Sequence, residues 1–195
     1  VLLRVDSPGG VVSAAEKIFH AVDLARKQKP VVASMGGKAA SGGYYVACAA
    51  ERVFAQRTTI TGSIGIFGGK LVLEDLLERS RVSTRTYSRG KRAGMYDFSR
   101  RFNIEERLVL KETLENHYRR FVDRVARSRK KSFAEIQAVA QGKIWTGREA
   151  VDIGLVDSIG GFQEALEALR DLAAGFHQSL PSRNRSGDEE HQSGD

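Results

Sequence analysis

The chain has 195 residues, 41% hydrophobic and 28% charged, with a net charge of +7. This balance indicates one globular domain with an ordinary core, and no stretch approaches the ~18 apolar residues of a membrane span. One cysteine excludes an internal disulfide framework, and the four histidines lack metal-site spacing, so we expect neither a metal nor a cofactor.

The chain opens on an apolar run followed by turn formers. "VLLRV" predicts a buried strand that the turn "DSPGG" ends. Ser13 and Glu16 have the spacing of a capping box, which predicts a helix reaching about Arg26. Because the first strand has no lead-in, we expect the chain to be an N-terminally truncated piece of a longer protein.

A second strand, "PVVASM", leads into a Gly-rich loop and a buried helix. The loop is "GGKAASGG", and the helix is expected over "SGGYYVACAA". Further strand-like segments are predicted at "RVFAQ", "TTITGSIGIFGG" and "STRTYS". Cys48 lies in the apolar run of the helix, which favours a buried structural thiol.

The second half is helical. Asn103 and Glu106 cap a long predicted helix that reaches about Arg129, with an apolar stripe made of Ile104, Leu108, Tyr118, Phe121, Val122 and Val125. Ser132 with Glu135, and Thr146 with Glu149, predict two more helices. A short strand and a closing helix complete a domain over residues 1–174, and residues 175–195 are expected to be a disordered polar tail.

Strands that alternate with helices predict an α/β domain with a largely parallel sheet. In such sheets the loops at the carboxyl ends of the strands carry the chemistry. Two loops qualify here, "DSPGG" and "GGKAASGG".

Ser41, in the second loop, has two interpretations. It is either a helix-capping serine or a nucleophile with small neighbours that leave room for a substrate. In the second case, the N–H groups of Gly42 and Gly10 are the candidate donors to an oxyanion. No histidine is suitably placed as the base, and Lys38, Lys70 and Lys91 are the candidate lysines.

Positive charge gathers in residues 79–131, which hold 17 Lys or Arg and 6 Asp or Glu, a net +11, whereas the remainder of the chain carries −4. This region matches no nucleic-acid motif, so we expect no nucleic-acid partner. It is either a solvated helix face or a patch that faces a membrane or another subunit.

Four blocks carry a family resemblance: "RVDSPGG", "MGGKAASGGYYVACAA", "TGSIGIFG" and "GKIWTGREAVDIGLVDSIGGFQEAL". Over Val1 to about Ala173 the chain resembles the signal peptide peptidase A family, peptidase family S49. The resemblance implies the ClpP/crotonase fold of repeated β-β-α units. It also implies a membrane-associated serine endopeptidase that degrades remnant signal peptides with a Ser-Lys dyad.

By the same resemblance, Ser41 is the nucleophile, and Gly10 and Gly42 supply the oxyanion hole. The family is anchored in the bacterial cytoplasmic membrane, with the catalytic domain on the extracytoplasmic side, and assembles into a homo-oligomeric ring or dome. Short members carry the dyad lysine in a G-x-x-K pattern, but this chain has "RGKRAG", with Ala93 at that position. We therefore expect the chain to be the C-terminal half of a long member, with its lysine elsewhere and Lys91 as the alternative within the chain.

Two other functions remain open at this stage. A crotonase-type enzyme would use the same pair of loops to polarise an acyl-CoA thioester. A non-catalytic half of the same family would serve assembly or membrane recruitment through the basic region.

Overall fold

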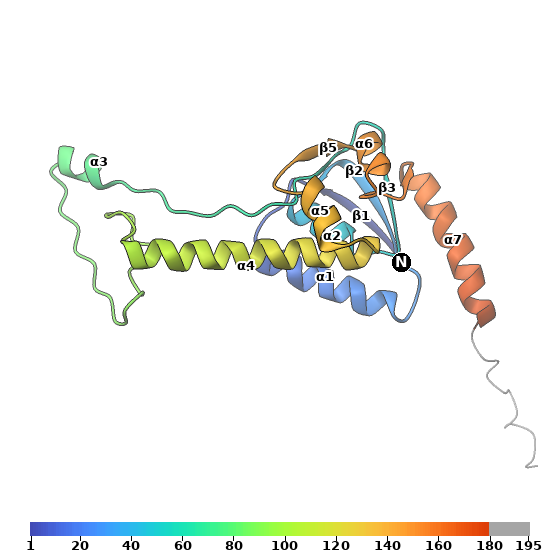
Figure 1. Cartoon of the computed structure of the whole chain (residues 1–195), viewed down its shortest axis with the longest axis horizontal. Helices are drawn as coiled ribbons and strands as arrows, with labels where there is room; N and C mark the ends of the chain where they lie inside the picture. The colour runs from blue at the N-terminus through green and yellow to red at the C-terminus, as the bar shows by residue number, and fades with distance from the viewer. Residues whose placement is uncertain (180–195) are drawn as a thin grey trace, which may run out of the picture.

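A mostly parallel sheet of six strands forms the core of the computed structural model, which describes residues 1–179 (Figure 1). The elements, in chain order, are β1 (Leu2–Ser7), α1 (Val12–Arg26), β2 (Val32–Ala40), α2 (Gly42–Ala47), β3 (Arg52–Ala55), β4 (Ile60–Gly62), α3 (Glu74–Arg79), α4 (Ile104–Arg129), α5 (Phe133–Val139), β5 (Ile144–Thr146), α6 (Gly147–Asp152), β6 (Ser158–Ile159) and α7 (Phe162–Ser179). The predicted α/β class is confirmed.

Strand β2 organises the sheet. It pairs with β1 on one side, and with β3 and β4 on the other, all in parallel. β3 pairs with β6 in parallel, whereas β5 pairs with β4 in the antiparallel direction. Because β1 and β2 run in parallel, the two loops that follow them meet at the same edge of the sheet.

Two predictions near this edge were wrong. β2 continues through Gly36 to Ala40, so the expected loop "GGKAASGG" is mostly strand. α1 begins after Val11, without a side-chain cap, and Ser13 lies inside the helix. The predicted capping box fails because the Glu16 carboxylate is instead engaged by side chains of α2 and α4.

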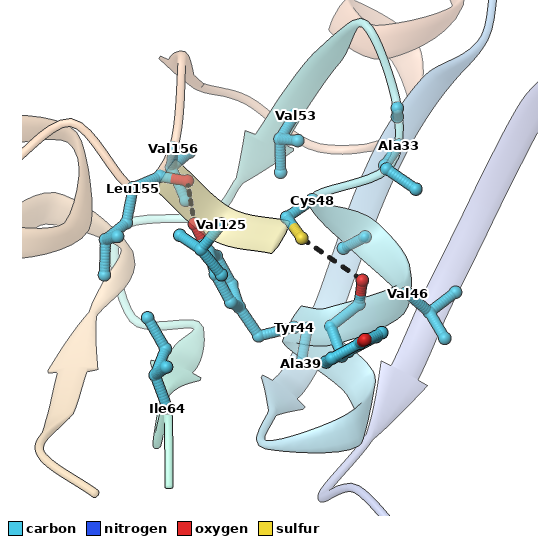
Figure 2. Close-up of a cluster of buried hydrophobic side chains, with 14 of the residues drawn as sticks. Ala33, Ala39, Tyr44, Val46, Cys48, Val53, Ile64, Val125, Leu155 and Val156 are labelled. Carbon is cyan, nitrogen blue, oxygen red and sulfur yellow. Dashed lines mark hydrogen bonds between the residues drawn. The ribbon is translucent and has the colours of Figure 1, made fainter. Parts of the chain in front are cut away.

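Helix α2 is almost wholly buried where it packs against β1, β2 and α1, and Figure 2 shows its buried residues Tyr44 and Val46. The hydroxyl of Tyr44 donates a hydrogen bond to the carbonyl of Leu155, at 2.8 Å. The thiol of Cys48 donates to the carbonyl of Tyr45 at 3.2 Å. This packing fixes the helix that begins directly after Ser41.

Burial raises the pKa of the Cys48 thiol to about 12, and the side chain is fully buried. Because the thiolate is the reactive species, we expect Cys48 to be inert toward Ellman's reagent in the folded protein at pH 8. One thiol per chain should react after unfolding in guanidinium. Rapid modification without denaturant would contradict the buried position.

The first half of α4 extends beyond the sheet (Figure 1). The extended segment that precedes this helix, residues 66–103, lies beside it, and we call this segment the distal arm. Ile104 and Leu108 were predicted to face the core but are 78% and 62% exposed. Tyr118, Phe121, Val122 and Val125 do pack on the core as expected. The strand predicted at "STRTYS" is absent, because that stretch of the arm runs free of any sheet partner.

Polar contacts hold the distal arm against the start of α4. Arg100 binds Glu106 at 2.6 Å, and Asn103 and Glu106 form the predicted capping box. The hydrogen bond from Arg100, followed by the backbone N–H of Asn103, lowers the pKa of Glu106 to about 2. The amine of Lys70 donates to the carbonyls of Met95 and Asp97, each at 2.8 Å.

The helices of the C-terminal third of the chain agree closely with those predicted from the sequence. The capping boxes at Ser132 and Thr146 begin α5 and α6, as predicted. α7 packs on the sheet through Ala165 and continues past Ala174, where the tail was predicted to begin. The rest of the predicted tail, residues 180–195, lies outside the described part of the chain. None of the helices within residues 1–179 has the length and apolar character needed to cross a bilayer.

Candidate active site

The turn after β1 and the turn after β2 are in close contact. Gly9 has φ +115°, and a Cβ built on it would lie 2.8 Å from the Cβ of Ser41 and 2.9 Å from the amide nitrogen of Gly42. A Cβ on Gly43 would lie 2.6 Å from the carbonyl oxygen of Ser7. Side chains are absent at these positions because the two backbones touch.

Ser41 has a strained backbone, with φ 52° and ψ −121°, in a region that non-glycine residues rarely occupy. Its N–H donates to the carbonyl of Gly62 and its carbonyl accepts from the N–H of Tyr45, both at 2.9 Å. Its side chain makes no capping hydrogen bond to α2. The capping interpretation of this serine is therefore wrong, and the hydroxyl is left available for other chemistry.

Two backbone amides, those of Gly10 and Gly42, lie next to the turn that holds Ser41. A Cβ built on Gly42 would be 3.1 Å from the amide nitrogen of Gly10, so the two glycines are direct neighbours. Within residues 1–179, neither amide N–H has a hydrogen-bond partner. The structure thus brings together Ser41, Gly10 and Gly42, the three candidate residues of the sequence.

Ser41 lines two adjoining pockets. The larger, about 830 Å³, is walled by the loop Pro8–Val11, by Ser63, by the segment 65–67, and by Tyr118, Gln141 and Gly142. The smaller, about 90 Å³, has an apolar lining that includes Val12, Ala15, Tyr45, Ile66 and Phe121. Together they form an open groove with a narrow apolar recess next to the hydroxyl.

Neither pocket is lined by a lysine, a histidine or an acidic residue of the described chain. Lys70 is bound to carbonyls of the distal arm, and Lys91 pairs with Glu105 at 3.2 Å. Lys38 lies on β2 but lines neither pocket. Groups of His, Cys, Asp and Glu suited to a metal ion are also absent from residues 1–179.

The smaller pocket rests on a charged cluster. The hydroxyl of Tyr45 donates to the carboxylate of Glu16, which also accepts from Arg124 at 2.7 Å. Burial opposes the ionisation of Glu16, but the hydrogen bonds from Tyr45 and Arg124 outweigh it and lower its pKa. Burial, followed by the hydrogen bond to Glu16, raises the pKa of Tyr45. The cluster ties α1 and α4 to the helix that follows Ser41.

Sequence reasoning did not single out the other three polar residues of the larger pocket, Ser63, Tyr118 and Gln141. Ser63 has φ 49°, and its N–H donates to the carbonyl of Lys143 at 2.7 Å. The signal available in the sequence was "TGSIG", where a serine stands between glycines after a strand. Tyr118 was assigned to the core stripe of α4, and nothing in its sequence neighbours distinguishes it from the other members.

Comparison with known proteins places the chain in a family. The model of peptidase family S49 matches residues 23–175. The chain is 40% identical over 174 residues to Protease 4 of Salmonella typhi, covering 89% of this chain and 28% of that protein. It is 36% identical to a putative signal peptide peptidase SppA of Enterococcus faecium, covering 87% of this chain and 50% of that protein.

A solved structure shares the architecture. A ClpP1 mutant from Listeria monocytogenes superposes with a TM-score of 0.56 at 17% identity, covering 85% of this chain and 76% of that chain. The chain spans about a quarter to three fifths of the length of the curated protease relatives that it matches. These matches show that the chain belongs to peptidase family S49 and has the ClpP/crotonase-like fold.

Proposed function

We propose that the chain supplies the nucleophile of a serine endopeptidase that degrades remnant signal peptides. The observation that carries this proposal is the hydroxyl of Ser41, which sits on a strained turn, makes no cap, and lines a groove beside two unpaired amide N–H groups. A hydroxyl in such surroundings is suited to attack on a peptide carbonyl.

The proposed reaction has two steps. Ser41 Oγ attacks the carbonyl carbon and passes its proton to a base, while the N–H groups of Gly10 and Gly42 donate to the oxyanion. The C–N bond then breaks, the amine leaves with that proton, and an acyl-serine remains. Water attacks this ester in the second step, which releases the acid and restores the hydroxyl.

The base we propose is a neutral lysine from outside this chain, because no lysine within residues 1–179 lines the Ser41 pockets. Burial lowers the pKa of a lysine and leaves it able to accept a proton. Lys91 is the alternative within the chain, but its amine pairs with Glu105 at 3.2 Å and it lines neither pocket.

The groove supports apolar peptides as substrates. The recess of about 90 Å³ has room for a small or medium apolar side chain next to the scissile carbonyl, and its walls are mostly apolar. A signal-peptide remnant is rich in such side chains. The enzyme would act at the extracytoplasmic face of the bacterial cytoplasmic membrane, held there by segments outside this chain.

Homo-oligomeric assembly, as a ring or dome, completes the proposal. The distal arm and the adjoining start of α4 expose apolar side chains, which include Phe67, Leu71, Leu76, Tyr87, Ile104 and Leu108. Such a concentration of exposed apolar surface is typical of an interaction site. A second copy of the chain is the partner that a ring requires.

A fluorophosphonate probe tests the nucleophile in the full-length protein. Ser41→Ala should abolish labelling and lower peptide cleavage by about 10³-fold or more. The matched control is Ser13→Ala, an exposed serine of α1 outside both pockets, which should retain both activities. Unchanged labelling and cleavage in Ser41→Ala would contradict the assignment and favour a non-catalytic half.

A further inference from the structure

Tyr118 differs from the other tyrosines near the site. Its hydroxyl oxygen is shielded from solvent and has no hydrogen-bond partner in the structure. Tyr44 donates to the carbonyl of Leu155, and Tyr45 donates to Glu16. A buried hydroxyl without a partner costs about 1–3 kcal/mol. The hydroxyl of Tyr118 therefore lowers the stability of the folded protein when no substrate is bound.

The same side chain forms part of the wall of the pocket of about 830 Å³ that contains Ser41. The polar side chains on this wall, within the described residues, are those of Ser41, Ser63, Tyr118 and Gln141, and none of them is charged. A wall of this kind is suited to the backbone of a peptide, whose carbonyl and N–H groups need neutral hydrogen-bond partners.

The arrangement of the groove indicates what would satisfy the hydroxyl. The loop Pro8–Val11 forms one side, and the segment 65–67 forms another, with Tyr118 contributed by α4. The hydroxyl is shielded from solvent, so the groove wall must shift for a peptide to reach it, and the segment 65–67 of that wall belongs to no helix or strand. An extended peptide in the groove presents a carbonyl group at every residue.

We propose that Tyr118 is a substrate-binding residue, whose hydroxyl donates a hydrogen bond to a backbone carbonyl of the peptide held in the Ser41 groove. The proposal rests on the proposed function and adds a contact to it. The hydroxyl lacks a partner in the free protein because the substrate supplies that partner on binding.

The test measures peptide binding in the full-length Ser41→Ala protein, which cannot turn the peptide over. The probe is a fluorescein-labelled peptide amide of alternating alanine and leucine, followed by anisotropy. Adding Tyr118→Phe should raise the Kd about 3- to 10-fold, the effect of losing one neutral hydrogen bond. The same change should leave the Tm of the free protein equal or higher, because a hydroxyl without a partner has been removed.

Tyr44→Phe is the matched control. It removes a satisfied buried hydroxyl, so the Tm should fall while the peptide Kd stays the same.

Each other outcome overturns the inference. An unchanged Kd in Tyr118→Phe means that the hydroxyl does not touch the peptide. A lower Tm in that variant means that the hydroxyl already has a structural partner. If the parent Ser41→Ala protein fails to bind the peptide, the proposed peptidase function fails as well, so the two failures are distinguishable.

Discussion

Gly9→Ala is expected to lower the kcat/KM of the full-length protein for peptide cleavage by about 10²-fold or more, although the substitution adds only a methyl group. The new Cβ would lie 2.8 Å from the Cβ of Ser41 and 2.9 Å from the amide nitrogen of Gly42. The φ of +115° is also unfavourable for alanine. The turn must therefore move away from Ser41, and a displacement of about 1 Å in such a site costs about 10²-fold.

Steady-state cleavage of an apolar peptide and fluorophosphonate labelling measure this effect. The matched control is Gly37→Ala on β2, where an added Cβ meets no atom within 4 Å. This variant should keep wild-type activity and labelling. Wild-type labelling in Gly9→Ala would mean that the contact between the two turns does not position Ser41.

Local signals predicted the elements whose ends are fixed by neighbouring residues. The capping boxes at Asn103, Ser132 and Thr146 each begin a helix, because the polar groups that bind one another are three residues apart. The same pattern failed at Ser13. There the carboxylate of Glu16 binds Tyr45 and Arg124, which are distant in the sequence.

The distal arm shows a second limit of structure prediction from the sequence. Ile104 and Leu108 continue the apolar period of α4, yet they lie beyond the sheet and contact no core. Periodicity indicates which face of a helix is apolar, but not how far the core extends along it. The strand predicted at residues 83–88 failed for a related reason, since a strand requires a neighbour that the chain does not place there.

The site was predictable where chain connectivity alone brings residues together. Parallel pairing of β1 with β2 places the turns that contain Gly10 and Ser41 at one edge, which the alternation of strands and helices already indicated. Ser63, directly after β4, and Tyr118, on α4, reach the same groove. Their convergence depends on tertiary packing and so could not be inferred from spacing along the chain.

The buried arginine at the end of α4 is expected to be the strongest single contributor to stability among the ion pairs. Arg129 is 3% exposed, and its guanidinium binds Asp157 at 2.8 Å. It also donates to the carbonyls of Cys48 and Ala50, which follow α2, at 3.5 and 3.4 Å. One side chain therefore joins α4, the end of the helix that follows Ser41, and the turn before β6.

Arg129→Met is expected to lower the free energy of unfolding by about 3 kcal/mol, near the lower limit for a broken buried ion pair. The lower limit applies because Asp157 is 40% exposed and still accepts from the N–H of Val53. For a chain of this size, the loss corresponds to a fall in Tm of about 6–12 °C. Thermal unfolding followed by circular dichroism measures it.

Arg127→Ala provides the control, since Arg127 is 73% exposed and pairs with Asp123 one turn away on α4. An exposed pair of this kind contributes about 0.3–0.5 kcal/mol, so the Tm should change by less than about 2 °C. Equal effects of the two substitutions would show that Arg129 acts as an ordinary surface charge. A large effect at Arg129 alone would show that its hydrogen bonds to the carbonyls of Cys48 and Ala50 hold α2, the helix after Ser41, in place.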